Sequence, residues 1–212
     1  MRDEKLEKIA ASLYDPKLNY HNFDHIRDVM NDADKILARC KGEGVEVDEA
    51  VVYYAILFHD AGFIEDHIGK GFDSKEAYSA DLAEKNLQGN SIDADTVQKV
   101  KQAIMATHID AQCLTNEDKL VRAADLAGLA ADYKVFKRNT VDLKNELAMM
   151  SGREISWDQW KKAASERIEL FLRQELCLTS DYYNEQGESK FHVNTRKNVK
   201  KLLLDDSEAI GN

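Results

Sequence analysis

Four side chains in this sequence are of the types that bind divalent cations, and three separate segments supply them. His25 lies early in one expected helix, His59 and Asp60 lie together at the end of a second, and Asp125 lies in a third. Imidazole nitrogens and carboxylate oxygens are ligands for Mn, Fe, Zn and Mg. A single histidine or aspartate on a helix is usually an ordinary core or surface residue. Helical bundles, however, build metal sites from inward-facing side chains of several helices, so the joint pattern predicts one metal site.

The surroundings of Asp125 strengthen this prediction. The residue lies in the stretch "VRAADLAGLA", where its neighbours in sequence are alanine and leucine. A carboxylate on a largely apolar helix carries a high desolvation cost unless a positive group meets it. A metal ion is one such partner, and Arg122 or Lys119 is another. An aspartate in an alanine-rich helix can also simply face solvent, and the sequence leaves these alternatives open.

The elements that must position these residues are all expected to be helices. One proline and ten glycines leave long segments in which apolar residues recur at helical spacing. Strand-like alternation and Asn-Gly hairpin turns do not occur. The fold class is therefore predicted to be all-α. The expected helices cover about residues 6–13, 22–42, 49–60, 77–89, 94–108, 117–130, 135–150, 157–176 and 195–204.

Residues with capping side chains mark several of the expected helix starts. Asp48 precedes the segment "EAVVYYAILFHD", which is apolar nearly all round and is therefore expected to lie at the centre of the core. Asp73 with Glu76 has the spacing of a capping box, as does Ser156 with Gln159. Asp93 is the expected cap of the segment that ends near His108.

Composition and charge limit the classes of protein that fit. A chain of 212 residues with 43% apolar and 32% charged residues is typical of one globular domain. The net charge of −10 makes a nucleic-acid partner a poor prediction, and the only basic run, Thr195–Lys201, reads as a solvated helix face. The longest apolar run, "AVVYYAILF", is too short to span a membrane. Three separated cysteines and a charged, amphipathic beginning predict a cytoplasmic location.

Three motifs carry a resemblance to a known family. The stretch "YHNFDHIRDV" is similar to the YHNxxHxxDV signature of cyclic-nucleotide phosphodiesterases and of small bacterial HD proteins. "ILFHDAGF" and "RAADLAGL" resemble the segments that supply the His-Asp dyad and the last aspartate in HD-superfamily phosphohydrolases. The motifs span residues 19–129. The resemblance implies a single HD-type helical bundle over residues 1–212, with the metal site between core helices. Its motif-bearing core would cover about residues 19–131, and a C-terminal helical extension about residues 133–205.

The resemblance also implies roles for individual residues. His25, His59, Asp60 and Asp125 would bind one divalent ion, which the family favours as Mn, Fe, Mg or Zn. Asp60, or alternatively Asp125, would also act in catalysis by orienting water or accepting its proton. His21 matches the family histidine that protonates the leaving-group oxygen. On a helix His21 and His25 would share one face, about 5–6 Å apart, although a histidine that only bonds the backbone at a helix start is an equal alternative.

Candidates for a second metal site or a phosphate contact are less regular. The dyad is not followed by the HDxxH pattern of two-metal members, and a Lys75-Glu76 pair stands where a His-Glu pair is common. Charged Lys75 cannot bind a metal but could contact phosphate, and Glu76 remains a candidate ligand. His67 lies in the following loop and is otherwise a solvated residue. His108 is the stronger candidate, with a histidine at a helix C-terminus as the alternative.

These features lead to two functional hypotheses. The first is a divalent-metal-dependent phosphohydrolase that acts on a phosphate ester of a small metabolite, with a nucleotide favoured and monoester or diester left open. The second is a regulatory HD module that binds metal or nucleotide with little or no turnover. The expected partner is a small-molecule phosphate ester, with no nucleic acid or membrane partner. The sequence does not indicate an oligomeric state.

Overall fold

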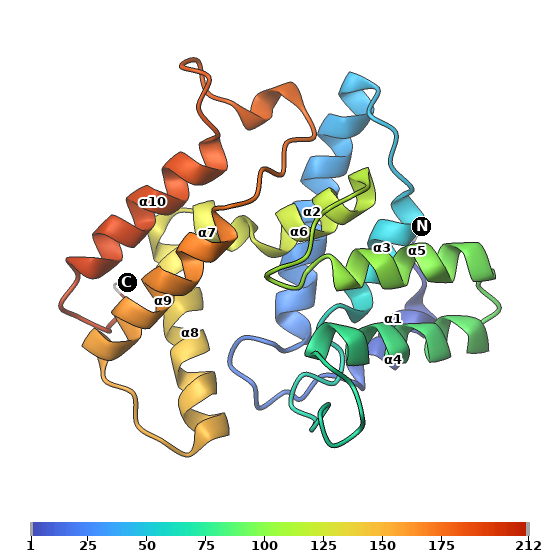
Figure 1. Cartoon of the computed structure of the whole chain (residues 1–212), viewed down its shortest axis with the longest axis horizontal. Helices are drawn as coiled ribbons and strands as arrows, with labels where there is room; N and C mark the ends of the chain where they lie inside the picture. Colours follow the sequence, from blue (N-terminus) through green and yellow to red (C-terminus); the bar gives the residue numbers. More distant parts are fainter. Residues whose placement is uncertain (1, 211–212) are drawn as a thin grey trace. The chain divides into compact units, whose positions relative to one another are not determined.

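The computed structural model describes residues 2–210, and these residues form helices joined by loops (Figure 1). Over this range the only β pairing is an isolated bridge between Tyr183 and Ser189, so the all-α prediction is confirmed. None of the helices in the described range is both long and apolar enough to cross a membrane. The elements are α1 (Glu4–Ala11), α2 (Phe23–Glu43), α3 (Glu49–Phe58), α4 (Lys75–Gly89), α5 (Ala94–Met105), α6 (Asn116–Asp125), α7 (Ala127–Ala130), α8 (Tyr133–Ser151), α9 (Trp157–Phe171), the 3₁₀ helix η1 (Ser180–Tyr182) and α10 (Lys190–Leu203).

The contacts divide the chain into two compact units, Met1–Asp125 and Leu126–Asn212. The first unit contains α1 to α6, and the second contains α7 to α10. The boundary therefore falls directly after Asp125, whereas the sequence placed the end of the motif-bearing core near residue 131. That the whole chain acts as one HD-type domain stays a prediction.

Helix α3 is the centre of the first unit. It contacts α1, α2, α4, α5 and α6, and every residue from Val51 to Phe58 except Tyr54 is buried. A helix that is apolar all round must be covered on all sides, which confirms the central position expected from its sequence. The residues that follow α3, buried His59 and half-buried Asp60, are thereby held next to the core.

Capping side chains fix most helix starts as expected. The side chains of Asp48, Asp93 and Ser156 cap α3, α5 and α9, and Ser156 forms the capping box with Gln159. The prediction for α4 is wrong, because Ser74 and not Asp73 is the cap. The Ser74 hydroxyl accepts a hydrogen bond from the amide of Ala77, three residues on, which is the spacing that a capping side chain requires.

Four helix boundaries differ from the expected ones by more than two residues, and one of them is the end of α9, which lies at Phe171 and not at residue 176. Helix α5 stops at Met105, because the amide and hydroxyl of Thr107 both donate to the carbonyl of Ile104 and tighten the chain into a turn. His108 therefore follows the helix and does not end it. The helix expected over residues 117–130 is interrupted at Leu126, where neither glycine nor proline announces a break. Helix α10 begins at Lys190 and not near residue 195, because Ser189 caps it.

The second unit has a small apolar core of its own. Phe136 from α8, Ile168 from α9, Leu172 just after α9, and Val199 and Leu202 from α10 are buried together. Partly buried side chains pack against this cluster, namely Leu129, Tyr133, Trp157 and Phe191.

Asp205, just after α10, ties the helices of the second unit together. Its carboxylate accepts hydrogen bonds from Tyr133 (2.8 Å) and Lys137 (2.9 Å) of α8. Its carbonyl accepts from Trp157 (2.8 Å) and Lys161 (3.0 Å) of α9. The bond from Lys137, with that from Tyr133, outweighs burial and lowers the pKa of Asp205 from 3.8 to about 2. The carboxylate therefore stabilises this unit in its ionised form.

We expect Asp205→Ala to lower the free energy of unfolding of the second unit by about 2 kcal/mol, because two partly buried donors lose their acceptor. The folded-state pKa is below the unfolded one, so this contribution is complete above pH 4 and disappears as the pH falls toward 2. Urea unfolding of the full chain at pH 7 and pH 3 measures both effects. Asp206→Ala, which removes a fully exposed neighbouring carboxylate, should change little; an equal loss in both variants would contradict this role of Asp205.

Candidate metal centre

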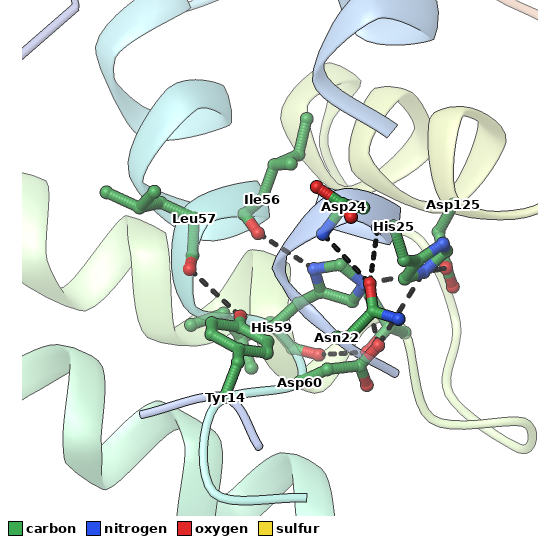
Figure 2. Close-up of polar contacts among 11 residues, drawn as sticks. Tyr14, Asn22, Asp24, His25, Ile56, Leu57, His59, Asp60 and Asp125 are labelled. Carbon is green, nitrogen blue, oxygen red and sulfur yellow. Dashed lines mark hydrogen bonds and ion pairs between the residues drawn. The ribbon is translucent and has the colours of Figure 1, made fainter. Parts of the chain in front are cut away.

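The start of α2 positions His25. Asn22 caps this helix, and its side-chain oxygen accepts hydrogen bonds from the amides of Asp24 (2.9 Å) and His25 (3.2 Å) (Figure 2). The amide group of Asn22 donates to the carbonyl of Leu18 at 2.8 Å, which fixes the cap to the preceding loop. The ring of Tyr20 lies against the imidazole of His25, with centroids 4.4 Å apart. His25 is buried, so both its backbone and its ring are held in place.

The end of α3 positions His59, which is 2% exposed. Its Nδ1 lies 2.9 Å from the carbonyl oxygen of Ile56. A carbonyl can only accept, so Nδ1 carries a hydrogen, and in the neutral ring the lone pair is on Nε2. Tyr14 donates to the next carbonyl, that of Leu57, at 2.9 Å. Metal-binding histidines typically have this arrangement, in which a hydrogen bond to one ring nitrogen orients the other toward the ion.

The two imidazoles and two carboxylates converge (Figure 2). One ligand atom from each of His25, His59 and Asp60 lies within 4.8 Å of the other two, and this group could hold a metal ion. Asp60 Oδ2 is 3.7 Å from Nε2 of His25 and 3.1 Å from Nε2 of His59. Asp125 Oδ1 is 3.5 Å from each of these two nitrogens. The structure thus brings together all four residues that the sequence proposed as ligands.

The spacing of these atoms fits a bound cation. Ligands about 2.1 Å from an ion lie about 3.4 Å apart in a tetrahedral arrangement and about 3.0 Å apart as octahedral neighbours. The four nitrogen-to-oxygen distances, 3.1 to 3.7 Å, lie within or up to about 0.3 Å above this range. Nε2 of His25 and Nε2 of His59 are also buried without a hydrogen-bond partner. Buried polar atoms are rarely left in this state, and a cation between them would satisfy both.

The electrostatics of the cluster also favour a positive charge at its centre. Burial disfavours protonation of His59, but the negative charges of Asp60 and Asp125 close to its ring outweigh it and raise the pKa of His59 well above its ordinary value. Burial likewise disfavours ionisation of the two carboxyls. The charge of His59 and then of His21 lowers the pKa of Asp60, and the proximity of the His25 and His59 rings lowers the pKa of Asp125. Both carboxyls are therefore ionised at neutral pH and available as ligands.

His21 lies beside this cluster but not on the helix. Helix α2 begins at Phe23, so the expectation that His21 and His25 share a helical face is wrong. Their rings are nonetheless neighbours, with centroids 6.1 Å apart in an edge-on arrangement. The imidazole of His21 stacks on the ring of Phe63, with centroids 3.6 Å apart and planes inclined by 14°. The role of His21 as a proton donor stays a prediction.

The candidates for a second site lie outside this group. In the described part of the chain, one cluster of histidine, cysteine or acidic residues has the spacing of a metal site, and it contains none of these candidates. His108 accepts a hydrogen bond at Nδ1 from the amide of Asp110, and Lys75 lies over the ring of Phe63. His67 lies partly buried in the loop after α3, and Glu76 lies in the first turn of α4. A second metal or phosphate contact at any of them stays a prediction.

Arg122 was named from the sequence only as an alternative partner for Asp125, and the structure gives it another position. It is fully buried and donates hydrogen bonds to the carbonyls of Ala106 (2.7 Å), His108 (2.6 Å) and Ile109 (3.5 Å). It therefore ties the loop after α5 to α6, one turn before Asp125. The sequence contains no signal for this role, because an arginine on an otherwise polar helix is usually exposed.

Asn22 also positions the site, and its role as a helix cap could be predicted from the sequence. An asparagine directly before the first apolar-periodic residue is a helix cap, and the interpretation of the sequence used it only as the start of a helix. Its second role, the bond from its amide group back to Leu18, depends on a loop conformation that the sequence does not specify.

The interpretation of this site depends on the structure and the sequence alone. In comparisons with models of known protein families and with curated protein sequences, no match to this chain was found.

Proposed function

We propose that this protein is a divalent-metal-dependent phosphohydrolase of the HD type, which hydrolyses a phosphate ester of a small metabolite. A nucleotide is the favoured substrate class. The observation that supports the proposal most is that two buried imidazole nitrogens without hydrogen-bond partners each lie 3.1 to 3.7 Å from a carboxylate oxygen of Asp60 and of Asp125. The resemblance of the motifs around these residues to HD phosphohydrolases supplies the reaction class.

The composition of the ligand set suits a phosphate ester. Two neutral imidazoles and two carboxylates balance the charge of a divalent ion, so an anionic ester is not repelled from the loaded site. Four protein ligands leave two positions open for an octahedral ion such as Mg²⁺ or Mn²⁺. When bound, such a cation would polarise a phosphoryl oxygen and lower the pKa of bound water.

The surrounding side chains have complementary roles in this proposal. Asp60 orients the attacking water and accepts its proton. His21, which lies next to the cluster, donates a proton to the oxygen of the departing alcohol. Lys75, near the same loop, provides a positive charge for a phosphate oxygen.

The test combines metal analysis with a substrate panel. The purified protein is loaded separately with Mn²⁺, Fe²⁺, Mg²⁺ and Zn²⁺, and its metal content is compared with that of chelator-treated protein. Release of phosphate or alcohol is then measured from nucleoside monophosphates, cyclic nucleotides and guanosine polyphosphates. We expect about one ion per chain and metal-dependent hydrolysis of at least one class. Tight nucleotide binding without hydrolysis would support the regulatory module, and a chain that retains no metal would contradict both functions.

A further inference from the structure

A stack of three side chains lies beside the metal cluster, and the cluster itself does not require it. The imidazole of His21 lies nearly parallel to the ring of Phe63, with centroids 3.6 Å apart. The ammonium nitrogen of Lys75 is also 3.6 Å from the centre of the Phe63 ring. A parallel ring at this distance covers one whole face of Phe63, so the ammonium group must lie over the other face. Three segments therefore meet here: the loop before α2, the loop after α3, and the start of α4.

The stack determines how His21 faces the cluster. A histidine in a loop has two side-chain torsions that are free to vary, and stacking against an aromatic ring holds the imidazole in one plane. The His21 and His25 rings are nearly perpendicular, with planes inclined by 79° and centroids 6.1 Å apart. The charge of His21 also contributes to the lowered pKa of Asp60, so His21 lies close to both ends of the site. Among the described aromatic rings, Phe63 is the one that lies flat against His21. The rings of Tyr20 and His25 are nearly perpendicular to it.

We propose that Phe63 is a positioning residue that holds the His21 imidazole in the orientation needed to protonate the leaving group. This inference rests on the proposed function. In the reaction, the bond between phosphorus and the leaving oxygen breaks, and water forms the new bond to phosphorus. The imidazolium of His21 gives its proton to the departing oxygen, and the proton lost by the water goes to Asp60 and returns to His21 through solvent. Water is the only co-reactant; the products are an alcohol and phosphate from a monoester, or an alcohol and a phosphate monoester from a diester.

Loss of this positioning role would change the relative rates of hydrolysis of two ester classes, which a general structural defect would not do. A nitrophenolate is a good leaving group and departs without a proton, whereas an alkoxide needs one. Misplacing the proton donor therefore slows the hydrolysis of alkyl esters much more than that of nitrophenyl esters. Disturbing the metal site would slow both to a similar extent.

The experiment compares Phe63→Leu with Phe63→Tyr and with Phe72→Leu, all in the full chain loaded with Mn²⁺. Phe72 lies in the same loop, and its ring packs against Tyr78, so Phe72→Leu is a matched loss of an aromatic ring. The probes are 4-nitrophenyl and ethyl esters of phosphate, each as monoester and diester. We expect Phe63→Leu to lower kcat for the ethyl ester by about tenfold more than for the nitrophenyl ester, with KM little changed. Phe63→Tyr should restore the wild-type ratio, and Phe72→Leu should leave it unchanged.

A second measurement does not depend on turnover. In the metal-free protein, the Cε1–H resonance of His21, assigned by its loss in His21→Gln, should be shifted by the ring current of Phe63. Phe63→Leu should remove this shift, and Phe63→Tyr should keep it. Equal slowing of both ester classes, or a His21 resonance that does not respond to Phe63→Leu, would overturn the inference. If the protein hydrolyses neither these esters nor any member of the nucleotide panel, the proposed function fails, and the resonance alone then decides whether Phe63 holds His21.

Discussion

His59→Ala is expected to lower metal affinity by more than about 100-fold and to abolish hydrolysis. Loss of a residue that merely orients a ligand costs 10- to 100-fold in metal affinity, and His59 is itself a candidate ligand. Its Nε2 lies close to both carboxylates, 3.1 Å from Asp60 and 3.5 Å from Asp125. Without His59, His25 would be the one imidazole left among the proposed ligands to share the ion with the two carboxylates. Metal content by elemental analysis and phosphate release measure the two losses.

Stability provides an independent readout of the same change. An ion present at 100 times its dissociation constant raises the free energy of unfolding by about 2.7 kcal/mol. The wild-type chain should show this gain on addition of Mn²⁺, and His59→Ala should not. His192→Ala is the matched control, because His192 lies in the second unit and bonds Ser189 and the carbonyl of Leu172. Undiminished hydrolysis in His59→Ala would contradict the proposed metal centre.

Arg122→Ala is expected to lower the free energy of unfolding of the first unit by about 4 kcal/mol. The substitution removes hydrogen bonds to three backbone carbonyls, two of them shorter than 2.8 Å. Those carbonyls then lack a donor, which costs about 1–3 kcal/mol for each one that stays buried. The large, fully buried side chain also leaves a cavity. Urea unfolding at pH 7, monitored by circular dichroism, measures the loss.

Lys119→Ala is the control for this change. Lys119 is on the same helix, is partly exposed and carries the same charge, so its removal should cost less than about 0.5 kcal/mol. If Arg122→Ala were as stable as Lys119→Ala, the loop after α5 would not depend on Arg122. We also expect Arg122→Ala to weaken metal binding, because Asp125 lies one turn further along α6.

The helices and their starts were largely predictable, because local rules determine them. Asp48, Asp93 and Ser156 each carry a side chain that can satisfy amides two or three residues ahead, and such caps depend on sequence spacing alone. The burial of α3 follows from its uniformly apolar composition. The four proposed ligands could be named because each is a polar residue in or next to an apolar segment.

Features that depend on packing between distant segments were not predictable. The stack of His21 on Phe63 joins residues 42 positions apart, and no periodicity connects them. Arg122 is buried because the carbonyls after α5 need donors, which is a property of a loop conformation and not of the arginine. The interruption at Leu126 has no glycine or proline to mark it. In each case a tertiary contact overrides what the local sequence favours.

The way α3 ends has a consequence for the order in which ligands reach the site. The last peptide groups of a helix direct their oxygens along its axis and together act as roughly half a negative charge. His59 and Asp60 follow directly on this end of α3, so the backbone adds to the negative potential of the two aspartates. If the proposed function holds, a phosphorylated metabolite would meet an electrostatic barrier at the metal-free cluster. The cation would then bind first, and substrate affinity would rise with metal occupancy.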